Sequence, residues 1–476
     1  MIISFSFFLL IFVAIGLLSA LVNKHNNADY LLANYSVKPW LVALSAVASC
    51  NSGFMFIGMI GYTYIYGLSS IWLMIGWVLG DFLASLFIHK KLRIITKEKL
   101  ILSFAGVISK WGDFNYKKLR AYLGVVTVIF LGTYAAAQLS AGSKALHVLF
   151  GWNYEVGAII GAIMVLLYCF VGGIRASIWT DAAQSFVMML AMGLLCFVAI
   201  KEIGGGLEFV ARANLVSDNY LSLFPQNIEF GYFIGPVLFV VGWLFAGFGV
   251  IGQPHIMVRF MAMDDPKNMK KVRCYYYSFY AIFYFLTILA GMVSRILIPD
   301  SNNFDAELAL PTLASSLLPE ILVGLILAGL FAATMSTADS QILSCTAALT
   351  RDFNSGKPSY LITKLATILV TLISLLIALY GSKSVFSLVL ISWSALACAF
   401  SPLLIIYVFK GRPSENLSLL ISISSILMML IWHYSELNKY IYEIAPGMIF
   451  GVLVYFALKK FSRYTSLQKT HQKHSK

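Results

Sequence analysis

The chain has 476 residues, of which 60% are hydrophobic and only 12% are charged. Apolar runs of about 20 residues, the length that crosses a bilayer as a helix, recur along it and exclude a soluble globular fold. The formal net charge of +13 does not indicate a nucleic-acid partner. The lysines and arginines lie in the gaps between apolar runs, where membrane proteins place their cytoplasmic anchors.

The six cysteines give no sign of a disulfide framework or a zinc site, because they lie in or beside apolar runs and no two have CxxC spacing. The sequence also has no nucleophile elbow and no phosphate-binding glycine loop with its lysine. We therefore predict that the chain is not an enzyme and that its cysteines are packing residues.

Thirteen apolar runs predict an all-α membrane protein of about 13 transmembrane helices. The runs cover residues 3–22, 40–62, 68–88, 119–149, 156–172, 180–203, 231–254, 275–298, 317–350, 360–381, 384–408, 416–434 and 441–459. The first run lacks the positive segment and the small-residue cleavage site of a signal peptide. It is therefore expected to be a retained helix.

Two gaps between the runs, at 89–118 and 255–274, are strongly basic and are expected in the cytoplasm. With an odd number of spans, this places the N-terminus outside and the basic C-terminal tail inside. The gaps on the other side, from Lys201 to Glu229 and from Arg295 to Glu307, carry mixed or acidic charge and agree with this orientation.

Two of the runs contain enough glycine and polar residues to be locally unwound. The run at 40–62 contains Asn51, Ser52 and Gly53, and the run at 231–254 has repeated glycines before Pro254. Paired broken helices mark the binding site of an inverted-repeat transporter, because free carbonyls at mid-membrane depth must line a cavity or be buried in protein. The alternative for either run alone is close helix packing through small residues.

A stripe of small and hydroxyl residues follows one helix face. It consists of Ala333, Ser336, Thr337, Ser340 and Ser344, which fall within a sector of about 100°. Na⁺ is a hard cation that prefers hydroxyl and carbonyl oxygen, so two hydroxyls and the carbonyls of a broken neighbouring helix would nearly complete its shell. Serine and threonine also join helices by hydrogen bonds, which is the alternative interpretation of the stripe.

Asp181 and Asp339 are carboxylates in apolar surroundings, where an acid is costly and marks an ion path or a paired base. For Asp181 the alternative is a helix-start position at the inner interface near Arg175, where the helix dipole favours an acid. Asp339 lies deeper in its run, just off the hydroxyl stripe. His255 and Arg259, at the inner end of another helix, are expected to be interfacial anchors.

Four motifs resemble those of the sodium/solute symporter family, and within it the sodium/proline symporters, over nearly the whole chain. They are LSAVASCNSG at Leu44–Gly53, GGIRASIWTDAAQ at Gly172–Gln184, GQPHIMVRFMA at Gly252–Ala262 and FAATMSTADSQ at Phe331–Gln341. The resemblance implies a five-plus-five inverted-repeat core of the leucine-transporter type, with extra flanking helices at both ends. Thirteen spans agree with that architecture.

On this basis the chain divides into four parts. Residues 1–38 are expected to form an N-terminal flanking helix and a cytoplasmic loop, and residues 39–408 the inverted-repeat transport core. Residues 409–460 are expected to form two C-terminal flanking helices, and residues 461–476 a solvated, basic cytoplasmic tail. The expected location is a bacterial inner membrane, where the chain spans the lipid bilayer and functions as a monomer.

The resemblance also implies binding sites. The principal Na⁺ site matches the carbonyls of Ala48, Asn51 and Ala333 and the hydroxyls of Ser336 and Thr337. A second cation site of some members, nearer the cytoplasm, matches Asp181, Ser336, Asp339 and Ser340. Solute contacts in proline-transporting relatives match Ser52, Gly53, Tyr134 and Pro254.

The chain also departs from the pattern of proline symporters. It has Cys50 where they place an aspartate, and Ala246 and Val250 where they place aromatic residues. Trp243 offers a ring close by, but helix geometry turns it about 60° away from Ala246. Asp339 is predicted to supply the counter-charge that Cys50 lacks.

The expected function is Na⁺-coupled symport of a small organic solute, with an amino acid such as proline as the first candidate and Na⁺ as the coupling ion. Alternatives within transport are another nutrient, such as a sugar or a carboxylate, and H⁺ coupling through a buried acid. A solute sensor on the same fold is the alternative from a different class. Sensors normally carry a long cytoplasmic signalling region, and the tail here is short.

Overall fold

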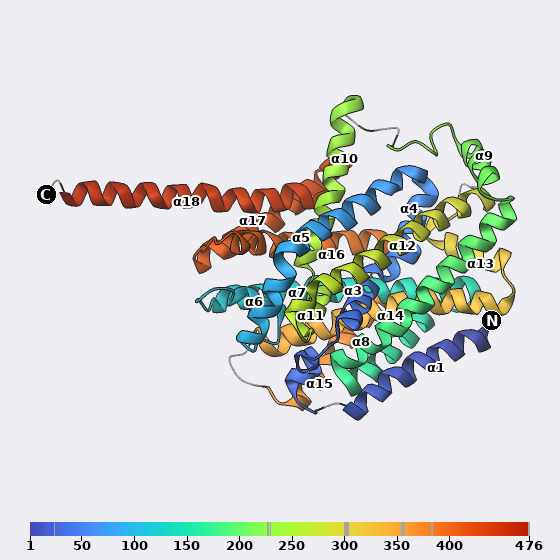
Figure 1. The fold of residues 1–476 in the computed structure, drawn as a ribbon, viewed down its shortest axis with the longest axis horizontal. Coiled ribbons are helices and arrows are strands. Elements are labelled where there is room, and N and C mark those ends of the chain that lie inside the picture. The colour runs from blue at the N-terminus through green and yellow to red at the C-terminus, as the bar shows by residue number, and fades with distance from the viewer. Residues whose placement is uncertain are drawn as a thin grey trace.

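The protein is an all-helical bundle in a computed structural model that describes residues 1–22, 24–225, 228, 230–298, 304–353, 358–381 and 384–474 (Figure 1). The described residues form no strand, apart from an isolated bridge between Val37 and Met263. Within them, nine helical spans are long and apolar enough to cross a membrane, and two shorter apolar helices lie at 2–18 and 444–459. The expected all-α membrane fold is confirmed.

The span from Pro39 to Glu98 turns back on itself once. It contains α3 (Pro39–Gly53), a π-helical turn (Phe54–Gly58), α4 (Met59–Tyr66), a 3₁₀ turn (Gly67–Ser70) and α5 (Ile71–Glu98). The reversal begins at Gly67, whose φ of 63° is left-handed and whose missing Cβ leaves room for the carbonyl of Tyr220. These residues therefore correspond to the two runs expected at 40–62 and 68–88.

The span from Tyr154 to Ile203, helix α8, is also interrupted. Gly173 has a φ of 56° and a ψ of −144°, and the side chain and carbonyl of Tyr30 pack where its Cβ would be. Two helical segments therefore meet at Gly173, as the separate runs at 156–172 and 180–203 predicted. The second segment begins earlier than expected, which places Asp181 inside a helix.

Helix α14 (Glu320–Arg351) is the central element of the bundle and carries the hydroxyl stripe. It packs against α3, α7 (Lys117–Phe150), α8 and α1 (Ile2–Leu18). In the most apolar 18-residue stretch of α14, 89% of the residues are buried, compared with 28% in that of α15 (Tyr360–Tyr380). Figure 1 shows α14 in the middle of the bundle, with α1 at the edge.

The second broken helix consists of α10 (Gly231–Phe248), a 3₁₀ turn (Gly249–Gly252) and α11 (Pro254–Ala262). Gln253 between them is non-helical, with a φ of −96° and a ψ of 103°. Pro254 is the first residue of α11, where its missing N–H costs no helical hydrogen bond. Both predicted breaks, in α3 and in this segment, are thus present.

The remaining long helices are α12 (Met269–Leu297), α16 (Val385–Val408), α17 (Glu415–Tyr434) and α18 (Ile444–His474). Short helices occupy gaps that the sequence left as loops, namely α2 (Asn27–Leu32), α6 (Phe104–Ser109), α9 (Gly206–Val216) and α13 (Ala309–Leu317). The tail expected at 461–476 continues α18 as a helix to His474, and Figure 1 shows this helix extending beyond the bundle.

Candidate ion and solute site

The break in α3 arises at Ser52, a buried residue with a φ of 37° and a ψ of 177°. A left-handed φ is strained for serine, and the surroundings compensate by satisfying the backbone that the break frees. The N–H of Gly53 donates to Oε1 of Gln138 at 2.7 Å, and the N–H of Phe54 donates to Oγ of Ser52 at 3.1 Å. Gln138 of α7 therefore holds the broken segment, a role that the sequence analysis missed.

The hydroxyl stripe of α14 faces this broken segment. Ser336 donates to the carbonyls of Ala48 and Ala333 at 3.3 and 3.1 Å. Thr337 donates to the carbonyls of Ser49 and Ala333 at 3.2 and 3.1 Å. Four of the five positions predicted for the sodium site, all except Asn51, are therefore joined by direct contacts, and the carbonyl of Ser49 joins them.

Asn51 differs from its predicted role. Its carbonyl accepts from the N–H of Phe54 within the broken segment, and neither polar atom of its buried side chain has a hydrogen-bond partner among the described residues. Among the described residues, no hydrogen bond links it to Ser336 or Thr337. Asn51 therefore remains a predicted ligand that the described contacts do not join to the other four.

The oxygens around Ser336 and Thr337 suit a hard cation. Hydroxyl and carbonyl oxygens about 3 Å apart are spaced like neighbours in the shell of an ion with bonds of roughly 2.4 Å. Each hydroxyl has a second lone pair, so it can turn its hydrogen away and present oxygen to the ion. The donor set contains no nitrogen or sulfur, which fits Na⁺ as a transported ion.

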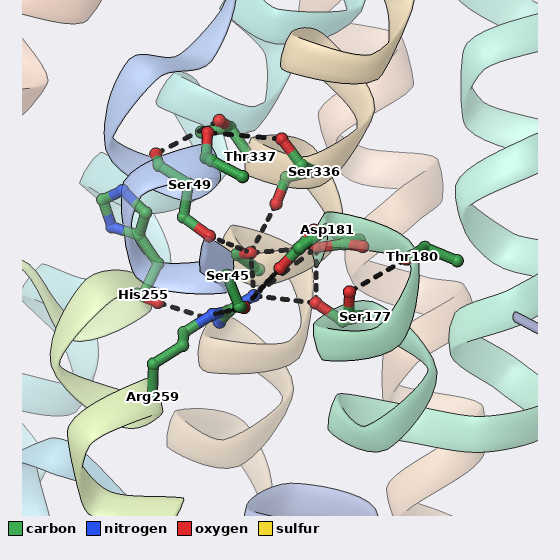
Figure 2. A network of polar contacts seen from close by, with 12 residues as sticks. Ser45, Ser49, Ser177, Thr180, Asp181, His255, Arg259, Ser336 and Thr337 are labelled. Carbon is green, nitrogen blue, oxygen red and sulfur yellow. Dashed lines mark hydrogen bonds and ion pairs between the residues drawn. The ribbon is translucent and has the colours of Figure 1, made fainter. Parts of the chain in front are cut away.

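A charged network lies directly beside the stripe (Figure 2). Arg259 of α11 contacts Oδ2 of Asp181 at 3.2 Å and Oδ1 of Asp339 at 3.7 Å. It also donates to Ser45 at 3.1 Å and to Ser177 at 2.7 Å. All five side chains are fully buried, so one guanidinium joins α11 to α3, α8 and α14.

This network corrects two expectations. Arg259 is not an interfacial anchor, because it is 0% exposed, and His255 is equally buried. Asp181 is not at a helix start near Arg175, because it lies inside α8, whereas Arg175 binds Asp29. The physical reason is the same in both cases, since opposite charges that pair across helices can be buried where single charges cannot.

Ser340 joins the charged network to the stripe. Its hydroxyl donates to the carbonyl of Ser336 at 2.5 Å and lies 3.0 Å from Oγ of Ser49 and 2.9 Å from Oδ1 of Asp339. Arg259 also contacts it. The residues predicted for a second cation site are thus brought together, with the arginine among them, and the site itself stays a prediction.

Three of the four predicted solute residues lie at the break in α3. The hydroxyl of Tyr134 lies 3.5 Å from Oγ of Ser52, next to Gly53. The ring of Tyr134 packs edge-on against His255, 5.6 Å between centroids, and His255 follows Pro254. Pro254 itself lines a small pocket between α6, α7, α11 and α14.

An aromatic ring from a different helix lies against Ala246, one of the two positions that lack aromatics. The indole N–H of Trp393 of α16 donates to the carbonyl of Ala246 at 3.2 Å. Trp393 also packs against Trp77, 5.0 Å between centroids. Trp243, the ring considered from the sequence, instead stacks on Tyr442 at 5.0 Å.

Polar contacts lie at both ends of the core. On the side of α13, Lys144 binds Asp305 and Glu307, and Glu307 also accepts from the N–H of Phe386 at 3.0 Å. At the other end, Oδ1 of Asp352 accepts from Ser103 at 2.5 Å. Burial raises the pKa of the Asp352 carboxyl to about 7, although Ser103 and nearby arginines oppose the shift.

The model of the sodium:solute symporter family matches residues 30–423. The chain belongs to this family. A sodium/proline symporter of Staphylococcus aureus is 28% identical over 484 aligned positions, which cover 96% of this chain and 91% of the relative. The resemblance inferred from the four motifs is confirmed.

Solved structures show the same fold. A Na⁺-coupled sialic acid symporter in a substrate-bound, outward-open state has a TM-score of 0.80 at 18% identity, covering 95% of each chain. A nucleobase-cation-symport-1 family transporter with bound bromovinylhydantoin has a TM-score of 0.60 at 14% identity, covering 92% of this chain and 96% of the other. The fold is therefore of the leucine-transporter type.

As a member of the sodium:solute symporter family, the protein is a multi-pass secondary transporter and not an enzyme, and Na⁺ is its coupling ion. Its activity is Na⁺-coupled solute symport, which takes a small molecule and Na⁺ as cargo. Sodium is thus a transported substrate, and the oxygens around Ser336 and Thr337 are the candidate ligands.

Proposed function

We propose that the protein imports an amino acid together with Na⁺, and that proline is the first candidate. The observation that carries the proposal is the junction of Ser336 and Thr337 with the carbonyls of the broken helix α3. The 28% identity to a sodium/proline symporter over 96% of the chain supports the solute class.

In this proposal Na⁺ binds between α3 and α14 and fixes the broken segment of α3. The ion replaces hydroxyl-to-carbonyl hydrogen bonds by ion-oxygen contacts, which draw the carbonyls of Ala48 and Ser49 toward α14. Ser52 and Gly53 follow directly in the chain and lie against Tyr134. Sodium binding thereby orders the segment that contacts the solute, so the two cargoes bind cooperatively.

We further propose the topology expected from the sequence, with 13 spans in a five-plus-five core and flanking helices. The interruptions at Gly67 and Gly173 each divide one long span into two crossings, and the two short apolar helices add two more. An odd number of crossings places the termini on opposite sides, and the basic gaps at 89–118 and 255–274 then put the N-terminus outside and the C-terminus inside a bacterial inner membrane. The division at residues 38, 408 and 460 and the monomeric state belong to the same proposal.

The solute is tested by uptake into proteoliposomes that contain the purified protein. A panel of labelled amino acids, sugars and carboxylates is offered while a Na⁺ gradient or an H⁺ gradient is imposed separately. We expect accumulation of proline or a related amino acid under the Na⁺ gradient. Accumulation of a sugar or a carboxylate, with no amino acid transported, would contradict the proposed solute class.

The residues of the pocket predict which amino acids bind more tightly. Ala246 and Val250 are small, and Trp393 supplies its ring from α16 rather than from α10. Proline should therefore bind weakly, or a bulkier amino acid should bind better, because small side chains at these two positions leave more room in the pocket. A competition series in which proline is clearly the tightest ligand would remove this argument.

A further inference from the structure

Asp81 of α5 is a buried acid that lies outside the network of Arg259. It is in the apolar part of the helix, ten residues after the helix begins at Ile71, and it is 0% exposed. Its carboxyl oxygens are buried, and the hydrogen-bonding groups beside them are the hydroxyls of two tyrosines of α12. It forms no ion pair within the described part of the chain, unlike Asp181 and Asp339.

The groups nearest to this carboxyl are hydroxyls and a thiol. Tyr276 and Tyr277 of α12 face Asp81, and their buried hydroxyls are the nearest hydrogen-bonding groups to its carboxyl. Cys50 of α3 and Tyr280 of α12 lie further from Asp81. The thiol of Cys50 donates a hydrogen bond to the phenol oxygen of Tyr280 at 3.1 Å. All four neighbours are neutral in their ordinary protonation states.

None of the other helices that pack on α5 forms an ion pair with Asp81 among the described residues. Helices α10 and α16 contain no Asp, Glu, Lys, Arg or His, and Gly247 of α10 lies against the backbone nitrogen of Asp81. On α11 the charge of Arg259 is bound to Asp181 and Asp339. On α12 the nearest cation in sequence is Arg273, one turn before Tyr277. On α5 itself, His89 packs against Phe260 and Arg93 donates to Asp264.

An isolated carboxylate in a membrane interior is neutralised by a cation or by a proton. A sodium ion needs five or six oxygen ligands, whereas Asp81 and its two tyrosines supply four oxygens at most. A proton needs one oxygen and leaves the group able to donate to a tyrosine. We propose that Asp81 is a proton-binding site, separate from the sodium site, and that its proton is carried during the transport cycle.

The surroundings also connect this proton to the broken helix. The rings of Tyr276 and Tyr280 lie 5.6 Å apart between centroids, and Tyr280 binds Cys50, which directly precedes Asn51 and Ser52. The hydroxyl chain thus leads from Asp81 to the segment of α3 that contacts sodium. The step itself is COO⁻ + H⁺ → COOH, with the proton taken from water on one side and released to water on the other when α5 and α12 separate.

The first experiment requires no solute. Infrared difference spectra of the purified protein at rising pH detect the C=O stretch of a protonated carboxyl, and the spectrum of Asp81→Asn is subtracted from that of the wild type. We expect a protonated-carboxyl band that persists at neutral pH in the wild type and is missing in Asp81→Asn. Asp264→Asn, which removes a carboxyl paired with Lys38 outside the spans, should keep the band. A band of equal size in Asp81→Asn would overturn the proposal.

The second experiment uses the proteoliposomes of the uptake assay with a pH-sensitive dye inside, so this arm rests on the proposed function. We expect solute uptake by the wild type to acidify the interior, and Asp81→Asn to take up solute without acidification. Tyr277→Phe keeps the carboxyl of Asp81 and should shift the pH dependence of the acidification. This variant replaces Asp81→Asn in the test if Asp81→Asn does not insert into the membrane. Equal acidification by wild type and Asp81→Asn, or none by either, would refute proton carriage. Failure to transport any amino acid would refute only the proposed solute.

Discussion

The guanidinium of Arg259 lies 3.2 Å from the carboxylate of Asp181, and neither side chain is exposed. The arginine is 3.7 Å from Asp339 as well, so one positive charge compensates two acids from two different helices. Breaking such a pair leaves buried charge without a partner, which costs far more than the pair itself contributes.

Arg259→Met should therefore lower the stability of the protein by about 3–5 kcal/mol. Arg259→Lys keeps a charge but not the fork of donors. Its stability should therefore lie between that of the wild type and that of Arg259→Met. Thermal unfolding of the purified protein measures both. Arg212→Met is the matched control, because Arg212 and Glu208 form an exposed pair that contributes about 1 kcal/mol or less. A melting temperature for Arg259→Met equal to that of wild type would show that the charges are compensated in another way.

The same arginine bears on the number of sodium ions. A guanidinium already between Asp181 and Asp339 repels a second cation at that position. We expect one Na⁺ per chain in equilibrium binding of radiolabelled sodium. Two ions per chain would instead establish the second cation site predicted at Asp181, Asp339 and Ser340.

Ser336→Ala and Thr337→Ala should each raise the Na⁺ concentration for half-maximal uptake about three- to tenfold, because each removes one oxygen ligand worth about 0.5–1.5 kcal/mol. The control is Thr346→Ala on the same helix, whose hydroxyl binds the carbonyl of Ile342 and the side chain of Thr367. Sodium titration of uptake separates the three variants. An unchanged sodium requirement in both site variants would mean that the stripe joins helices and binds no ion.

Gly53→Ala should abolish transport for a steric reason. Its φ is −59°, which any residue adopts, but an added Cβ would lie 2.7 Å from Cγ2 of Thr334 and 2.8 Å from Cβ of Ala141. Thr334→Ser and Ala141→Gly remove these two atoms, so the triple variant should recover part of the uptake. No recovery in a triple variant that is present in the membrane would indicate that Gly53 is needed for contact with the solute itself.

Asp352 predicts a pH dependence of stability. Its pKa is raised to about 7 by burial, so the folded protein keeps a proton that the unfolded chain has already lost. The free energy of unfolding should therefore fall as pH rises toward 7 and level off above it. Thermal unfolding at about pH 5 and about pH 8 measures the difference. Asp352→Asn should remove this part of the pH dependence, and Ser103→Ala should extend it to higher pH, because the bond from Ser103 opposes the shift.

The breaks and the stripe could be predicted from the sequence because they depend on local chemistry. Glycine, proline and small polar residues weaken a helix wherever they lie, and helical spacing places Ser336 and Thr337 on one face. The partners of the stripe were less accessible. Thr337 contacts the carbonyl of Ser49 and not that of Asn51 because the chain turns at Ser52, and that turn is a property of the packed bundle.

The direction of Arg259 could not be predicted, because an arginine at the inner end of a helix usually extends to the interface. Its inward position depends on two acids from distant parts of the chain. The contacts of Asp339 with Arg259 and Ser177 were equally inaccessible, and its role as the charge missing at Cys50 stays a prediction. Asp81 could have been noticed, because it is a lone acid in the apolar run at 68–88.

Helix α14 carries Ser336, Thr337 and Asp339, and nearly all of its apolar window is surrounded by protein. Solubilisation exchanges lipid for detergent at the outer surfaces, such as that of α15, and leaves the neighbours of α14 in place. Ion affinity should accordingly be the same in micelles, nanodiscs and vesicles. Sodium titrations of the extracted protein then report the ligand set that operates in the membrane.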